Sequence, residues 1–216
     1  MSIDNLEKKL NGELPVTREE LIVLINSWGR THSFCTIDSN NFDIIIKECE
    51  KKESYDLSKL DTSEILDMSS IFRQSNFNGN ISNWNTSNVT NMEQMFYRAS
   101  SFNQPIGNWN VANVTNMLSM FGYAKQFNQP LSNWNVTNVT NMGFMFGQAS
   151  NFNQPIGNWN VGKVTSMWAM FSNATHFNQP IGAWNTANVT FMSGMLFNAI
   201  NFNHPIENWN VANVTA

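Results

Sequence analysis

Few side chains in this sequence could carry acid–base, nucleophilic or metal chemistry. From Arg73 onward the ionic side chains are Arg73, Glu93, Arg98, Lys125, Lys163 and Glu207. General acid and base catalysis requires titratable groups gathered in one pocket, and the two carboxylates of this region lie far apart in the sequence. The sequence contains no glycine-rich phosphate loop and no Ser-His-Asp pattern. We therefore expect a protein that is not an enzyme and uses no cofactor.

The histidines and cysteines do not have the spacing of a metal site. His32, His176 and His204 have no partner His or Cys at ligand spacing. Cys35 and Cys49 are the only cysteines, and such a pair neither frames a disulfide scaffold nor completes a zinc site. We expect no bound metal, and two idle thiols are the favoured interpretation of the cysteines.

Five Asn-Val-Thr triplets satisfy the N-glycosylation pattern. They begin at Asn88, Asn113, Asn138, Asn188 and Asn213. A structural role is favoured over glycosylation, because a glycan on each triplet would crowd its neighbours about 5 Å away in stacked coils.

The Asn-Val-Thr triplets are part of a long internal repeat. Six tryptophans fall 25 residues apart, at Trp84, Trp109, Trp134, Trp159, Trp184 and Trp209. A fixed period of this length predicts a solenoid, because one copy cannot bury its own apolar face and needs its neighbours. We divide the chain into an N-terminal cap over 1–59 and an array over 60–216. The array holds a degenerate copy at 60–83, five full copies over 84–208 and a truncated copy at 209–216.

The cap should contain an amphipathic helix over residues 18–28. Thr17 and Glu20 fit a capping box, and the apolar residues that follow are spaced three and four apart. We expect the apolar face of this helix to close the stack. A second candidate helix spans 40–51, where residues 44–46 would also suit a strand.

Each coil should pair a short helix with a short parallel strand, which gives an α/β fold. In the copy that begins at Trp109, a set of apolar residues has the spacing of one helix side: Val114, Met117, Met120, Phe121 and Ala124. Thr115 is placed to cap that helix. A proline in every copy should precede the strand, which we place at Leu131 to Trp134.

Two files of asparagine, one residue per copy, are candidates for ladders of hydrogen-bonded amides between coils. The first file is Asn85, Asn110, Asn135, Asn160, Asn185 and Asn210. The second is Asn103, Asn128, Asn153, Asn178 and Asn203.

The motif F-N-x-P-I/L-x-x-W-N followed by V-T-x-M-x-x-M-F-x-x-A resembles the BspA-like leucine-rich-repeat surface proteins of bacteria. The resemblance is to their mycoplasma-lipoprotein repeat branch, whose function is unknown. It covers Leu60 to Thr215. It implies a leucine-rich-repeat-like solenoid used in surface binding or adhesion, and it supplies no catalytic residues.

Positions that vary between copies are free to contact a partner, since the repeated positions form the scaffold. Large apolar residues gather at these variable positions: Tyr97, Leu118, Tyr123, Phe144, Trp168 and Phe197. We predict a partner-binding surface there if the side chains face water. The alternative is that the rings pack sideways over adjacent coils.

The partner we expect is a protein, on a host or cell surface. Cations are too few for a nucleic-acid track, and the longest early apolar run, Leu21 to Ile25, is too short for a signal peptide or membrane span. Localisation is left open. The uncovered edge of the truncated last copy predicts a homodimer. An alternative function is a water-organising, ice-binding-like solenoid, although the repeated threonines that it needs are expected to cap helices.

Overall fold

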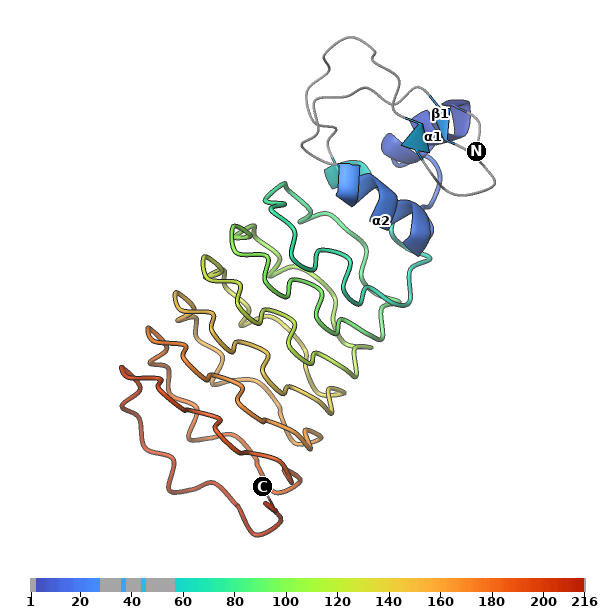
Figure 1. Cartoon of the computed structure of the whole chain (residues 1–216). Helices are drawn as coiled ribbons and strands as arrows, with labels where there is room; N and C mark the ends of the chain where they lie inside the picture. The colour runs from blue at the N-terminus through green and yellow to red at the C-terminus, as the bar shows by residue number, and fades with distance from the viewer. Residues whose placement is uncertain (1–2, 28–35, 38–43, 46–56, 216) are drawn as a thin grey trace.

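The computed structural model describes residues 3–27, 36–37, 44–45 and 57–215. Figure 1 shows successive coils stacked along one axis, with two helices at the N-terminal end. These helices are α1 (Ile3–Leu10) and α2 (Arg18–Ser27). Strand β1 (Thr36–Ile37) pairs antiparallel with β2 (Ile44–Ile45), and a 3-10 helix spans Leu57–Lys59. Among the described helices none is long and apolar enough to cross a membrane.

Helix α2 confirms the predicted cap helix. The backbone N–H of Glu20 donates to Thr17 Oγ1 at 3.3 Å, and the N–H of Thr17 donates to Glu20 Oε2 at 2.9 Å, which completes the capping box. Leu21, Leu24 and Ile25 are buried in the core that continues into the coils. The helix therefore covers the first coil with its apolar face, as expected.

Parts of the cap predictions lie outside the described residues. These parts include Trp28, His32, Cys35 and Cys49. Of the segment 40–51, the structure describes Ile44–Ile45, and these two residues form β2, as the strand interpretation predicted.

The coils contain neither a helix nor a strand, so the predicted α/β, leucine-rich-repeat-like coil is wrong. From residue 60 to 215 the backbone consists of turns and extended segments joined by isolated parallel bridges. The predicted strand from Leu131 to Trp134 is a turn, in which the N–H of Trp134 donates to the Leu131 carbonyl at 3.0 Å. The bridges lie elsewhere, at Asp67, Asn91, Asn116, Asn141, Ser166 and Phe191.

The predicted helix is instead a series of overlapping four-residue turns, each closed by a bond from an N–H group to the carbonyl three residues earlier. The N–H groups of Met117 and Ser119 donate to carbonyls of the next coil, while the N–H of Met120 donates to the Met117 carbonyl at 3.2 Å. Ser119 has a φ of 55°, the left-handed conformation that type II turns require at their third residue. Consecutive turns of this kind bury every third or fourth side chain. The sequence period therefore imitates that of a helix.

Thr115 is consequently not a helix cap. Its Oγ1 and its N–H donate to the Thr90 carbonyl of the preceding coil, at 3.2 and 2.9 Å. The equivalent threonines from Thr90 to Thr215 make the same contact with the coil before.

The core is a set of columns of identical side chains. Phe96, Phe121, Phe146 and Phe171 stack along the array with centroids 5.5 to 5.7 Å apart. Each repeated tryptophan also donates its indole N–H to a backbone carbonyl 27 or 28 residues earlier in the sequence. Trp134 Nε1 donates to the Ile106 carbonyl at 3.1 Å, and five other tryptophans repeat this bond. Neighbouring coils thus share both apolar contacts and buried hydrogen bonds.

One of the two asparagine files links neighbouring coils, through bonds to backbone N–H groups and not through the expected amide–amide bonds. Asn103 Oδ1 accepts the backbone N–H of Asn128 at 2.9 Å, and the same bond joins the other members of that file. The file of Asn110 does not link coils in this way. Its Oδ1 accepts the N–H of Ala112, two residues later in the same coil, as in an Asx turn.

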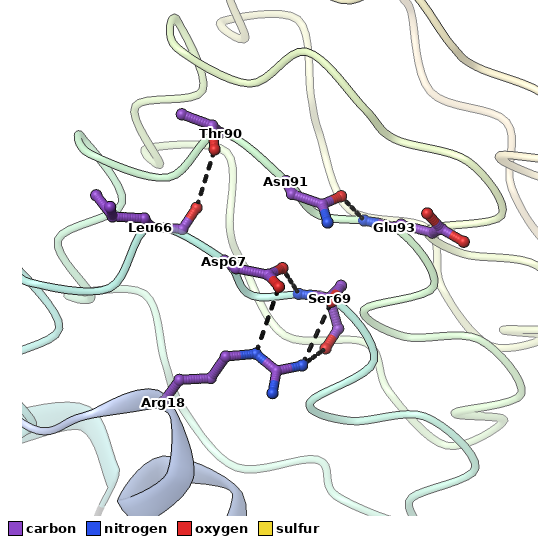
Figure 2. A network of polar contacts seen from close by, with 7 residues as sticks. All are labelled: Arg18, Leu66, Asp67, Ser69, Thr90, Asn91 and Glu93. Carbon is purple, nitrogen blue, oxygen red and sulfur yellow. Dashed lines mark hydrogen bonds and ion pairs between the residues drawn. The ribbon is translucent and has the colours of Figure 1, made fainter.

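On the methionine side of the coils every second N–H group, such as those of Met117, Ser119 and Phe121, donates to a carbonyl of the next coil, so these peptide groups point the same way. At the N-terminal end of the array, Arg18 Nη2 donates to the Ser69 carbonyl at 2.7 Å. Arg18 Nη2 also lies 3.3 Å from Ser69 Oγ, and Nε lies 3.7 Å from Asp67 Oδ2 (Figure 2). A cation at the carbonyl end of aligned dipoles is electrostatically favourable. Helix α2 is thereby attached to the first coil.

Candidate binding surface

Four of the six predicted contact residues form one line on the side of the coils. We name this line the aromatic strip, and it consists of Tyr97, Tyr123, Phe144 and Trp168. Ring centroids lie 5.5 Å apart from Tyr97 to Tyr123, 5.5 Å from Tyr123 to Phe144 and 5.7 Å from Phe144 to Trp168. Each ring comes from the next coil along the array, so the coil period sets the spacing.

The rings of the aromatic strip pack against one another and still reach water. Tyr97, Tyr123 and Phe144 are partly exposed, and Trp168 keeps 49% of its surface accessible. The sequence left two alternatives open, exposed rings or rings packed sideways over adjacent coils. The structure combines both. A row of rings held by each other loses little conformational freedom when a partner binds.

Leu118 lies beside the strip, and Phe197 lies at its far end. A methyl group placed on Gly143 would come within 3.2 Å of Leu118 Cδ1, so the leucine lies over this glycine, next to Phe144. Phe197 is 66% exposed. Within the described part of the chain Phe197 has no ring contact with the strip.

Two members of the strip project from left-handed backbone positions. The φ angles are 61° at Tyr123 and 53° at Phe144. This conformation costs an L residue about 1–2 kcal/mol, and it is unusual for a bulky side chain. Because hydrogen bonds to both neighbouring coils fix the backbone here, the fold imposes the conformation and aims both rings sideways.

Two glycines make room for the central ring of the strip. A methyl group at Gly147 would lie 2.5 Å from Cδ2 and Cε2 of Phe144, and one at Gly122 would lie 2.9 Å from its Cδ1. The phenyl ring therefore rests on the backbone of its own coil and reaches the coil before. Gly122 and Gly147 occupy the repeat position that Tyr97 and Phe197 occupy in other coils, and a small residue near a large one was a usable signal in the sequence.

Two arginines extend the strip toward the N-terminus, and sequence reasoning did not include them. Arg73 Cζ lies 5.5 Å from the Tyr97 centroid. Arg98 Cζ lies 5.5 Å from the same centroid and 5.1 Å from that of Tyr123. These distances are those of cation–π contacts. Both arginines are exposed, so their guanidinium groups lie at the surface beside the rings.

The three coils at the N-terminal end of the strip, residues 60–133, contain three cations and four carboxylates, those of Asp61, Glu64, Asp67 and Glu93. Arg73, Arg98 and the exposed Lys125 occur in three consecutive coils. The ion pairs of the described residues, Lys9 with Glu20 and Arg18 with Asp67, involve none of these cations. Glu93 Oε2 accepts a hydrogen bond from Asn116 Nδ2 at 3.0 Å.

The remaining residues with potential chemistry have structural contacts. His176 Nδ1 lies 2.7 Å from the Ser150 carbonyl, and His204 Nε2 lies 3.2 Å from the Asn178 carbonyl. Asn113 Nδ2 donates to the Ser87 carbonyl of the preceding coil at 2.7 Å, as expected of a structural Asn-Val-Thr triplet. In the described residues no group of three or more His, Cys, Asp or Glu side chains could hold a metal ion.

The last coil leaves apolar and backbone groups uncovered. Val211 is 54% exposed, whereas the equivalent Val161 is buried. Ile206 is also exposed, in contrast to Ile181. A row of N–H groups has no acceptor among the described residues, namely those of Met192, Gly194, Leu196 and Asn198.

A family model described as Mycoplasma protein of unknown function, DUF285, matches residues 40–150 and 130–216. The match names neither a BspA-like nor a leucine-rich-repeat family. No curated protein matches the chain, and no solved structure does.

Proposed function

We propose that this chain, which belongs to the family of Mycoplasma proteins of unknown function DUF285, is a non-enzymatic protein-interaction or adhesion module. The aromatic strip would be its contact surface, with Leu118 beside it and Phe197 at its end. The observation that carries the proposal is a line of partly exposed rings in mutual contact, on a fold that buries the repeated phenylalanines and tryptophans up to Trp184. Exposed aromatic clusters of this kind are typical of protein-binding sites.

The arrangement of the strip suits binding better than catalysis. Its rings offer apolar surface in a fixed line, and aromatic anchors in fixed positions commonly supply most of the binding energy of an interface. An adhesive role is further supported by the resemblance of the repeat to BspA-like surface proteins. We extend the proposal to a partner on a host or cell surface on that basis.

Peptide selection on the immobilised chain tests this proposal. A displayed random peptide library is selected on the unmodified chain, and the recovered peptides are then measured on Phe144→Ala combined with Trp168→Ala. Each substitution should weaken binding by about 1–3 kcal/mol while the fold, monitored by circular dichroism, stays intact.

Leu66→Ala is the matched control, because Leu66 is an exposed apolar residue of the first coil, outside the strip. It should leave the affinities unchanged. Peptides that bind the double variant as tightly as the unmodified chain would refute the proposed surface.

A water-organising role is a second candidate, favoured by one observation. Thr90, Thr115, Thr140 and Thr165 are exposed in one file and do not cap helices. Against this, their hydroxyl groups already donate to carbonyls of the preceding coil. Thermal hysteresis measured on the purified chain separates the candidates, since ice binding requires a depressed freezing point and partner binding does not.

A further inference from the structure

We infer that the partner binds the aromatic strip through an extended peptide segment with carboxylates at one end and apolar side chains at the other. This inference rests on the proposed function, because it specifies the chemistry of the partner for the same surface. The evidence for it is the contact of two arginines with Tyr97 at one end of the strip and the absence of charged contacts, among the described residues, at the other end, near Phe144 and Trp168.

Arg73 and Arg98 are ordered but not neutralised. Both guanidinium groups lie 5.5 Å from the Tyr97 centroid, and Arg98 also contacts Tyr123. Within the described part of the chain, neither forms an ion pair. A guanidinium group has five N–H donors in a planar fork that matches a carboxylate in a bidentate manner. Ring contacts that fix the fork reduce the entropy lost when such a group binds.

The positive charge is confined to the N-terminal end of the strip. The coil that contributes Phe144, residues 134–158, has no ionic side chain. The coil that contributes Trp168 has Lys163, whose Nζ donates to Asn138 Oδ1 at 2.7 Å, in the file of the Asn-Val-Thr triplets. A ligand that follows the strip therefore meets cations first and then apolar rings.

This gradient favours a peptide over a polyanion or a membrane. A nucleic acid or a sulfated polysaccharide repeats its charge along its whole length and needs cations along the whole track. An anionic membrane attracts clusters of several basic residues, and here the cations are few. A peptide can place acidic and apolar side chains at opposite ends of one short segment.

The dimensions of the strip fit a short extended segment. Successive rings are 5.5 to 5.7 Å apart. An extended chain rises about 3.3 Å per residue, so a segment on the order of five residues would span the distance from Tyr97 to Trp168.

Defined peptides test the inference. The probes are short peptides in which a block of Glu, Gln or Lys precedes the same tail of alternating Leu and Ser, measured by isothermal titration calorimetry. The Glu peptide should bind at least about tenfold more tightly than the Gln peptide, as expected for charge-assisted hydrogen bonds. Arg73→Gln combined with Arg98→Gln should abolish this ratio and leave the Gln peptide unaffected. Lys163→Gln is the matched charge control and should preserve the ratio.

The outcomes separate this inference from the proposed function. If Phe144→Ala with Trp168→Ala weakens both peptides but Glu and Gln peptides bind equally, the inference fails and the proposed surface stands. If that double variant binds the peptides as the unmodified chain does, the proposed surface fails. Strip-dependent binding of heparin or of anionic phospholipid vesicles, without binding of the Glu peptide, would overturn the inference in favour of a polyanion or a membrane.

Discussion

The ring of Phe144 rests directly on Gly147, with Cδ2 and Cε2 each 2.5 Å from where a methyl group on that glycine would lie. No side chain other than hydrogen fits at this position without moving the ring. The position of the Phe144 ring in the strip thus depends on a residue that has no side chain of its own.

Gly147→Ala should therefore displace Phe144 and weaken peptide binding about as much as Phe144→Ala does. Forcing a methyl group into an occupied space should also lower the free energy of unfolding by about 1–3 kcal/mol. Gly162→Ala is the matched control, since the equivalent positions Ala112 and Ala187 carry that methyl group. Affinity measurements and urea unfolding check both variants. Unchanged affinity for Gly147→Ala would show that the ring position does not matter.

Ala169→Gly should be neutral or stabilising by up to about 1 kcal/mol. Ala169 has a φ of 48°, and glycine adopts this left-handed conformation without steric cost. Gly194 occupies the same position in the next coil, with a φ of 65°. The fully buried Ala174, which is not left-handed, is the control. Ala174→Gly should destabilise by about 1 kcal/mol or more, and equal unfolding midpoints for the two variants would contradict the expectation.

Trp134→Phe should lower the free energy of unfolding by about 1–3 kcal/mol, because the buried Ile106 carbonyl would lose its indole donor. Trp209→Phe removes the equivalent bond to Ile181, but Trp209 lies partly exposed in the last coil, where water can replace the donor. Its effect should be smaller. Thermal or urea unfolding of both variants provides the comparison, and a larger loss for Trp209→Phe would contradict it.

Arg18→Gln should weaken the attachment of α2 to the first coil at a cost of about 1 kcal/mol, mainly through the lost bond to the Ser69 carbonyl. The pair with Asp67 is too exposed to contribute much. Asp67→Asn should therefore cost less than about 0.5 kcal/mol, while its Oδ1 can still accept the N–H of Ser69. Hydrogen exchange of α2 amides measures the attachment. Equal effects of the two substitutions would assign the attachment to the ion pair instead.

The repeat, the cap helix and the set of variable residues could be predicted from the sequence, and the internal structure of the coil could not. Thr17 and Glu20 identified the start of α2 because a capping box is a local signal. Met117, Met120 and Ala124 predicted a helix because burial at every third or fourth residue is common to helices and to successive four-residue turns. Which of the two forms depends on whether the N–H groups of Met117 and Ser119 bond within the coil or to the next coil.

The sequence by itself determined that the chain repeats every 25 residues, which positions vary and where the charges are absent. Those properties follow from residue identity and spacing alone. Only the tertiary structure decided that Phe144 lies on Gly147, that Arg73 and Arg98 meet Tyr97, and that neighbouring rings touch. The contacts of Arg73 with Tyr97 and of each ring with the next join residues of different coils, and the hydrogen bonds between coils set their register.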